Sequence, residues 1–191
     1  MPSTLASKAP RKKSSGKKQA KPEDETKPKI KIMWTYRASI EEIWDLWTTR
    51  AGLETWWAPE EFVMRVRRNE LRPGGEFEYA VTAMDLPQVE ALNAAGLPLS
   101  RIDKHTYTEV VPYKRIGYRT TIDYVPDVAP YEVATLVEFS PVDKAVRIVV
   151  TQDAMHNSEW TQTLALDLDK QFNRLARVVE KRREEEEEKS P

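Results

Sequence analysis

Cysteine is absent from this sequence and histidine is rare, and both shortages restrict the chemistry available to the chain. Without cysteine there are no disulfide bonds, thiolate metal ligands or cysteine nucleophiles. The two histidines, His105 and His156, lie outside any His-Glu-x-x-His pattern, and no cysteine can complete a zinc ligand set. The sequence therefore predicts no metal site, no cofactor and no catalytic residue.

The two histidines nevertheless have alternative interpretations. His156 lies near Asp153, Asn157 and Glu159, a grouping that would suit acid–base catalysis. The same residues fit a polar connection that caps the last helix, and this interpretation is favoured. His105, at the expected start of a strand, is also assigned a structural role.

Long apolar runs are missing as well. No stretch approaches the ~18 apolar residues of a transmembrane helix, and no apolar segment follows the basic N-terminal residues as it would in a secretory signal. These absences predict a cytoplasmic protein without a membrane span.

Aromatic residues are absent from the first 28 positions, which are rich in lysine. Such a composition cannot bury enough surface to offset the entropy of ordering, so residues 1–28 are predicted to be a disordered basic tail. Its lysines, Lys8–Lys29, have two interpretations: weak non-specific contact with a polyanion, or a linker without a partner. Residues 29–183 are expected to form one domain, and residues 184–191 an acidic tail that frays.

The charge of the chain is unevenly distributed. Residues 1–31 carry a net charge of +7 and residues 180–191 a net charge of −2, within a total of −1. The residues between them therefore carry about −6. A mildly acidic body of this kind does not favour a nucleic-acid-binding surface.

Two short helices are predicted directly after a first strand. Residues 29–37 alternate apolar and polar side chains, as a strand with one buried face does. Ser39 and Glu42 have the spacing of a capping box, and the apolar residues that follow share one helical stripe. Thr49 is predicted to cap a second short helix, which ends near Pro59.

Short strand-like segments follow the helices and are separated by turn-forming residues. Arg72-Pro73-Gly74-Gly75 places proline and glycine where a type II turn needs them. Hairpin connections at residues 112–115 and 140–144 indicate an antiparallel meander. The segments are residues 63–68, 77–83, 106–111, 116–124, 132–139 and 145–151.

Two further helices are predicted. Pro87 and Gly96 mark the ends of a short one, whose Val89 and Leu92 are positioned to cap an opening in the sheet. The last helix is predicted from Ser158 to Arg183 because its apolar residues fall within one helical arc.

This order of elements indicates an α+β helix-grip fold. A curved antiparallel sheet is expected to wrap around the long C-terminal helix, with the two short helices after the first strand. Such a fold leaves room for a cavity between sheet and helix. Its predicted ligand-binding residues are Trp57, Phe77, Tyr79, Tyr118, Trp160, Leu164, Leu168 and Phe172.

Several motifs resemble the SRPBCC (START-like, birch-pollen-allergen-like) superfamily. They are Arg37-Ala-Ser-Ile-Glu-Glu-Ile-Trp44, Trp56-Trp57-Ala58-Pro59, Arg72-Pro-Gly-Gly-Glu-Phe77, Tyr107-Thr-Glu-Val-Val-Pro112 and Glu159-Trp160. The branch that they resemble is the one related to the C-terminal domain of the activators of the ninety-kilodalton heat-shock ATPase. The resemblance implies the helix-grip fold and covers residues 29–181. The superfamily includes lipid and hormone carriers, aromatase/cyclases and chaperone regulators.

Three functions remain open on the sequence alone. The first is non-enzymatic binding of a small hydrophobic or aromatic molecule in the cavity between the sheet and the last helix. The second is a chaperone-regulating or other protein-interaction module. The third is an enzyme of the cyclase or hydrolase kind that uses the same cavity.

Overall fold

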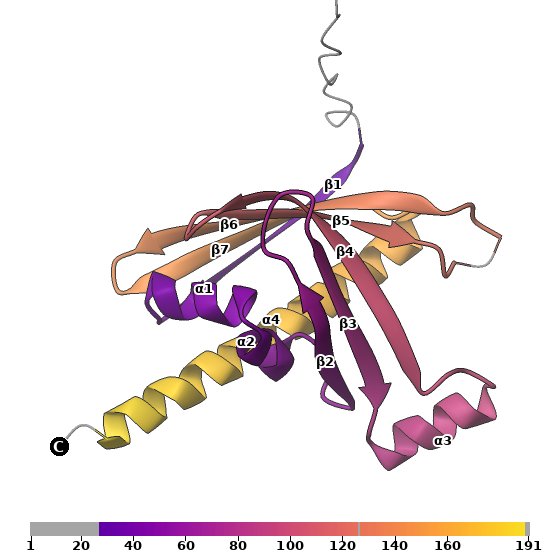
Figure 1. Ribbon diagram of the computed structural model, residues 1–191, viewed down its shortest axis with the longest axis horizontal. Helices are drawn as coiled ribbons and strands as arrows, with labels where there is room; N and C mark the ends of the chain where they lie inside the picture. Colours follow the sequence, from indigo (N-terminus) through magenta and orange to yellow (C-terminus); the bar gives the residue numbers. More distant parts are fainter. Residues whose placement is uncertain (1–26, 126, 190–191) are drawn as a thin grey trace, which may run out of the picture.

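Seven antiparallel strands form one curved sheet, and a long helix crosses its concave face (Figure 1). The computed structural model describes residues 27–125 and 127–189, so most of the predicted basic tail lies outside the described residues. The strand order is β1-β7-β6-β5-β4-β3-β2, which confirms the predicted α+β helix-grip fold. In chain order the elements are β1 (Lys29–Tyr36), α1 (Ile40–Thr48), α2 (Arg50–Trp56), β2 (Phe62–Asn69), β3 (Glu76–Ala83), α3 (Leu86–Ala94), β4 (Ser100–Val111), β5 (Arg115–Ile122), β6 (Tyr131–Val142), β7 (Ala145–Asp153) and α4 (Ser158–Lys189).

The helix pair α1 and α2 begins at the two predicted caps. The Ser39 hydroxyl accepts a hydrogen bond from the Glu42 backbone N–H at 3.1 Å, and the Thr49 hydroxyl accepts one from the Gly52 N–H at 3.0 Å. Gly52 allows the two helices to meet closely, since a Cβ there would lie 2.4 Å from the carbonyl oxygen of Asp45. The tight corner directs α2 toward the sheet and places Trp56 in the core.

The turns of the meander follow the predicted chemistry. The Gly75 N–H donates to the Arg72 carbonyl oxygen at 2.8 Å, and Gly74 has a φ of +76°, as the third position of a type II turn requires. The connections after β4 and β6 are also hairpins, with Tyr113 and Asp143 in the left-handed region. Each strand from β3 to β7 therefore lies beside the strand that precedes it.

Two element boundaries differ most from the predictions, by six residues each. Strand β4 begins at Ser100 rather than at residue 106. The prediction missed the first part of the strand because it carries charged side chains in place of an apolar alternation. His105 consequently lies within the strand, and its predicted position at a strand start was wrong. Helix α4 continues past Arg183 to Lys189, because glutamate favours helix and Arg183 pairs with Glu187 one turn away.

The core between the sheet and helices α1, α2 and α4 is built on closely packed aromatic rings. Trp47 lies 4.8 Å from Trp56 between ring centroids, and both rings contact Phe172 of α4. The Trp56 indole N–H donates to the Leu46 carbonyl oxygen at 2.9 Å, which satisfies its polar atom. This cluster fixes α4 against the first half of the domain.

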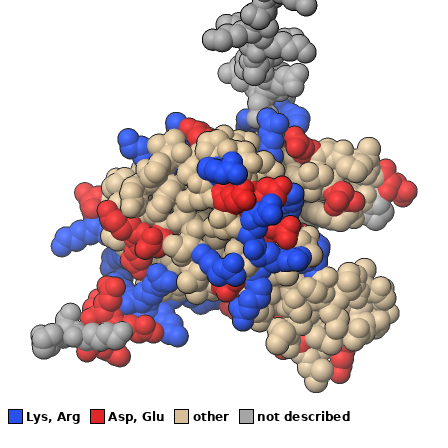
Figure 2. Space-filling model, in the orientation of Figure 1, with Lys and Arg blue, Asp and Glu red and all other residues tan. Residues whose placement is uncertain are grey.

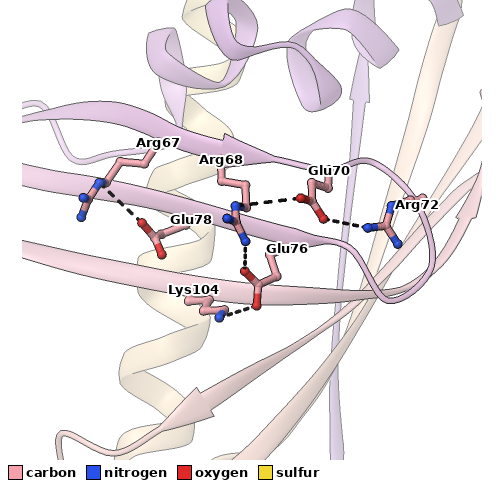
Figure 3. Close-up of polar contacts among 7 residues, drawn as sticks. All are labelled: Arg67, Arg68, Glu70, Arg72, Glu76, Glu78 and Lys104. Atoms are coloured by element: carbon pink, nitrogen blue, oxygen red, sulfur yellow. Dashed lines mark hydrogen bonds and ion pairs between the residues drawn. The ribbon is translucent and has the colours of Figure 1, made fainter.

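The outer face of the β2–β3–β4 part of the sheet carries a network of paired charges (Figure 3). Arg68 contacts Glu76 at 2.7 Å, and Glu76 also pairs with Lys104. Arg67 pairs with Glu78 at 3.5 Å. Since β2 is an edge strand, these charges discourage pairing with a strand of another chain.

The segment around α3, residues 84–99, projects from the sheet and is named the α3 arm (Figure 1). Helix α3 has no buried residue. The surface over the arm is almost free of charged side chains (Figure 2), and Met84 and Leu86 are each 66% exposed. Among the described residues, no helix combines the length and the apolar character that crossing a membrane requires.

Candidate functional site

A cavity of about 1110 Å³ opens between α4 and the concave face of the sheet. Inward-facing side chains of strands β3 to β7 form its floor, and residues 164–177 of α4 form one wall. Residues 57–62, which connect α2 to β2, form a second wall. Leu92, Leu97, Pro98 and Leu99 of the α3 arm border the cavity, whereas Val89 does not line it.

The eight residues predicted for this cavity divide into two groups. Phe77 and Phe172 are only 3% and 2% exposed and belong to the core, and Trp160 packs on a smaller cluster near Met155. Some residues on the apolar arc of α4 face the core and others face the cavity. Helical periodicity cannot tell core residues from cavity residues, because both belong to the same arc. Contact with a ligand stays a prediction for the five residues that line the cavity, which are Trp57, Tyr79, Tyr118, Leu164 and Leu168.

The wall formed by α4 is tied to the end of α2 by hydrogen bonds. Gln171 donates from Nε2 to the Trp57 carbonyl oxygen at 2.9 Å, and Arg174 donates from Nε to the Trp56 carbonyl oxygen at 3.3 Å. Both acceptors are carbonyl groups at the end of a helix, which have no partner within it. On the other side of α4, Tyr36 donates to the Phe172 carbonyl oxygen at 3.2 Å. These contacts position the helix above the cavity.

The floor of the cavity contains polar residues that the prediction omitted. His105 is 8% exposed and lies between Tyr79 and Thr120. Its Nε2 atom is 3.1 Å from the Tyr79 hydroxyl, and its Nδ1 atom is 2.5 Å from the Thr120 hydroxyl. Extending the strand pattern back from Tyr107 would have placed His105 on this face, since side chains alternate along a strand.

Burial keeps the ionisable groups of the floor uncharged at neutral pH. Desolvation lowers the pKa of His105 to about 4, because the charged imidazolium loses its hydration. Burial raises the pKa of Tyr118 to about 12, against a hydrogen bond with Thr135 that lowers it. Burial likewise raises the pKa of Tyr79 above its ordinary value, against a hydrogen bond with the Trp57 indole. The floor is therefore polar and neutral.

Charged residues gather at the edges of the cavity. Arg101 holds Asp103 with two contacts of 2.9 Å, Nε to Oδ1 and Nη2 to Oδ2. On α4, Arg177 pairs with Glu60 of the facing loop. Each pair has a net charge of zero, and both pairs lie among the cavity-lining residues.

His156 lies outside this cavity, in the connection between β7 and α4. Its Nδ1 atom is 3.1 Å from the Tyr131 hydroxyl, and its Nε2 atom is 3.1 Å from Nδ2 of Asn157. Asn157 accepts a hydrogen bond from the Trp160 N–H at 2.9 Å, as a helix cap does. The favoured interpretation as a polar, capping connection is confirmed. Among the residues described, no three His, Asp or Glu side chains are grouped as a metal site would need.

Solved structures with this fold come from several bacteria. Protein CV1439 from Chromobacterium violaceum is 22% identical with a TM-score of 0.63, and the match covers 80% of this chain and 96% of that one. A protein from Staphylococcus epidermidis is 19% identical with a TM-score of 0.64, covering 83% and 93%. CalU16 from Micromonospora echinospora is 12% identical with a TM-score of 0.55, covering 79% and 75%. At these identities the likeness shows the fold alone.

A family model matches most of the folded chain. Residues 37–180 fit the family described as Activator of Hsp90 ATPase homolog 1-like protein. No relative among curated proteins matches the sequence. The match confirms the superfamily and branch that the motifs resembled.

Proposed function

The chain belongs to the Activator of Hsp90 ATPase homolog 1-like protein family, and on that premise we propose that it is a non-enzymatic binding domain for a small hydrophobic or aromatic molecule. The ligand would lie between α4 and the sheet. The observation that carries this proposal is the cavity of about 1110 Å³. Cavities that bind small molecules usually measure about 300–1,000 Å³ and combine apolar walls with a few polar groups.

The character of the walls supports a ring-containing or aliphatic ligand. Trp57, Tyr79 and Tyr118 present aromatic surface from three different elements, and Leu164 and Leu168 present aliphatic surface from α4. Burial of apolar surface contributes about 25 cal/mol per Å², so an apolar molecule gains most of its binding free energy here from desolvation.

The cyclase- or hydrolase-type alternative would depend on an acid or base in the same cavity. His105 is a buried titratable group of the floor, but both of its ring nitrogens already have hydrogen-bonding partners. Its low pKa also makes it a weak base. These features favour binding over proton transfer.

A protein-interaction role, with a chaperone as one candidate partner, is the second proposal. It is favoured by the exposed side chains of the α3 arm, where Met84 and Leu86 are 66% exposed and Leu97 is 54% exposed. If this role holds, the protein should change the ATPase rate of the ninety-kilodalton heat-shock protein. Replacing Met84 and Leu86 by serine should abolish the change, and an unchanged rate with the wild-type protein would reject a chaperone role.

Retention of a ligand tests the first proposal. Native mass spectrometry of the protein purified from its own cells should reveal an added mass of a small molecule. Val81→Trp, which fills the cavity from β3, should remove that mass. Ala80→Trp, on the opposite face of the same strand, should retain it.

The outcome must be separated from misfolding. Leu164→Trp fills the cavity from α4 instead, so two independent variants report on the same space. The proposal fails if the wild-type protein carries no added mass and also gives no saturable signal with Nile red, an apolar fluorescent probe.

A further inference from the structure

A row of polar side chains crosses the floor of the cavity. His105 of β4 lies opposite Thr120 of β5, and Tyr118 of β5 lies opposite Thr135 of β6. Tyr79 of β3 completes the row through its contact with His105. All five residues line the cavity, so the hydrogen-bonding capacity of this row decides which ligand group the floor can accept.

One part of the row has a hydrogen atom to spare. Tyr79, neutral His105 and Thr120 together carry three polar hydrogens, one on each side chain. They share two hydrogen bonds, Tyr79 to His105 at 3.1 Å and His105 to Thr120 at 2.5 Å. One hydroxyl hydrogen therefore remains, whichever ring nitrogen of His105 is protonated.

The neighbouring indole indicates where that hydrogen lies. The Trp57 ring lies 6.1 Å from the Tyr79 ring between centroids, and its indole N–H, which can only donate, lowers the pKa of the Tyr79 hydroxyl. If Tyr79 donates its own hydrogen to Nε2, then Nδ1–H donates to Thr120, and every buried donor of the group except the Thr120 hydroxyl is paired. With the other tautomer the spare hydrogen would lie on Tyr79, which is 6% exposed, instead of on the less buried Thr120. The arrangement leaves the Thr120 hydroxyl as a donor at the cavity floor.

The second part of the row behaves in the same way. Tyr118 and Thr135 have one hydroxyl hydrogen each and lie opposite each other on β5 and β6, so at most one hydrogen bond joins the two hydroxyls. One hydrogen again remains, in whichever direction that bond runs. Since Tyr118 and Thr120 are two residues apart on β5, their side chains face the same side of the sheet.

The charge of the floor limits the ligand further. Arg101, the cation beside the row, already pairs with Asp103 through both carboxylate oxygens. Among the described strand residues that line the cavity, Arg101 is the one Lys or Arg, and Arg174 on the opposite wall donates to the Trp56 carbonyl oxygen. A carboxylate on the floor would therefore meet no unpaired cation of the sheet, and an isolated buried charge is strongly unfavourable. An uncharged oxygen acceptor meets no such penalty.

We infer that the floor of this cavity binds the uncharged acceptor oxygen of an aromatic ketone or a similar carbonyl compound. The inference rests on the proposed binding function and deepens it. Thr120 and the Tyr118–Thr135 pair donate to the carbonyl oxygen, while Trp57, Leu164 and Leu168 cover the rings. The binding site thus distinguishes a ketone from the hydrocarbon of the same shape, because only the ketone pairs the spare hydroxyl hydrogens.

Matched pairs of probes test this selectivity. Isothermal titration calorimetry would compare fluorenone with fluorene and benzophenone with diphenylmethane, each pair differing mainly in the carbonyl oxygen. The wild-type protein should bind each ketone about tenfold more tightly than its hydrocarbon, as one net hydrogen bond predicts. Fluorene-9-carboxylate should bind more weakly than fluorenone.

Variants assign the selectivity to the floor. Thr120→Val combined with Tyr118→Phe and Thr135→Val removes every hydroxyl that the inference names as a donor, and it should reduce the ratio of ketone to hydrocarbon affinity to about twofold or less. Thr120→Ser, which retains the hydroxyl, should restore the preference when it replaces Thr120→Val. Thr121→Val is the matched control, because Thr121 lies on the same strand but faces the convex side and is exposed.

Three results would contradict the inference. Equal binding of ketone and hydrocarbon by the wild-type protein would reject the carbonyl site but leave the proposed binding function standing. Loss of fluorene binding in the Thr120 variant would show a general packing effect rather than hydrogen bonding. Failure of both hydrocarbons and both ketones to bind would reject the proposed function together with this inference.

Discussion

At the scale of single residues, His105 links the chemistry of the cavity to the stability of the fold. It is 8% exposed, and desolvation lowers its pKa to about 4. In the unfolded chain its pKa returns to about 6.5. Between these values the unfolded chain binds a proton that the folded chain does not, so the free energy of unfolding should fall as the pH falls.

The first prediction concerns this pH dependence. Because of His105, the free energy of unfolding should fall by about 3 kcal/mol as the pH falls from 6.5 to 4. Above pH 6.5 the full stabilisation should be present. His105→Gln should remove this part of the slope, whereas His156→Gln, at an exposed histidine, should retain it. Urea unfolding at several pH values measures both, and identical slopes in wild type and His105→Gln would contradict the burial argument.

A second residue-scale prediction compares two leucines of α4. Leu175 is fully buried, so Leu175→Ala should cost about 3 kcal/mol, within the range for buried leucines. Leu168 is only partly buried and lines the cavity, so Leu168→Ala should cost about 1 kcal/mol. Denaturant unfolding with an unchanged m-value decides the comparison, and equal costs would mean that the cavity wall is packed as tightly as the core.

Sequence patterns predicted the residues of the aromatic core better than those of the cavity floor. Alternation identified Tyr79 as inward-facing, because Phe77, Tyr79 and Val81 recur at every second residue. Tyr118 was selected as a large aromatic residue of a predicted strand. His105 and Thr120 were missed because small or polar side chains on a buried face look the same in sequence as solvent-exposed ones. Only the three-dimensional pairing of β4 with β5 brings their side chains together.

At the scale of elements, the cavity depends on how α4 is held over the sheet. Gln171 and Arg174 donate to carbonyl oxygens at the end of α2, and the aromatic cluster anchors Phe172 between them. The position of α4 therefore follows from the helix pair that precedes β2, and a change in these contacts should alter the cavity without removing the core.

The third prediction tests these contacts. The pair Gln171→Ala and Arg174→Met should lower the free energy of unfolding by about 1–2 kcal/mol, because two helix-end carbonyl groups lose their partners. Gln162→Ala, at an exposed position of the same helix, should change it by less than about 0.5 kcal/mol. Unfolding curves for the three proteins measure the difference, and an unaffected double variant would show that the aromatic cluster alone positions α4.

Element types were predictable from the sequence, but their ends were not. Caps at Ser39 and Thr49 have a local signature, because a side chain three residues away satisfies the backbone. The start of β4 has no such local signature. The charged residues there pair at the edge of the cavity, as Arg101 does with Asp103, and within the sheet, as Lys104 does with Glu76. The run Glu184–Glu188 has no apolar face, yet it is helical in the structure; its fraying stays a prediction about dynamics.

At the scale of the whole molecule, the charges separate into a basic N-terminal segment and a mildly acidic body. The order of helices and strands, read from turns and caps, was sufficient to predict the helix-grip architecture, because few topologies accommodate a meander between two helical segments. The existence of an open cavity could not be read in the same way, since it depends on small gaps between side chains.

The fourth prediction concerns the charge separation. If Lys8–Lys29 contact a polyanion, the full-length protein should bind duplex DNA weakly at low salt and lose that binding steeply as salt rises. The same chain without residues 1–28 should not bind, because its surface is acidic overall. Fluorescence anisotropy with labelled DNA measures both proteins, and equal binding would reject the tether interpretation in favour of a linker.

The central claim is that a small apolar molecule binds between α4 and the sheet, and methyl NMR tests it most directly. With fluorenone added to methyl-labelled protein, intermolecular NOEs should connect its ring protons to Leu164, Leu168 and Val81, which line the cavity. Leu175 in the core and Leu86 on the α3 arm should show none. NOEs confined to Leu86 and Met84, or no NOE to any methyl group at saturating fluorenone, would contradict the claim.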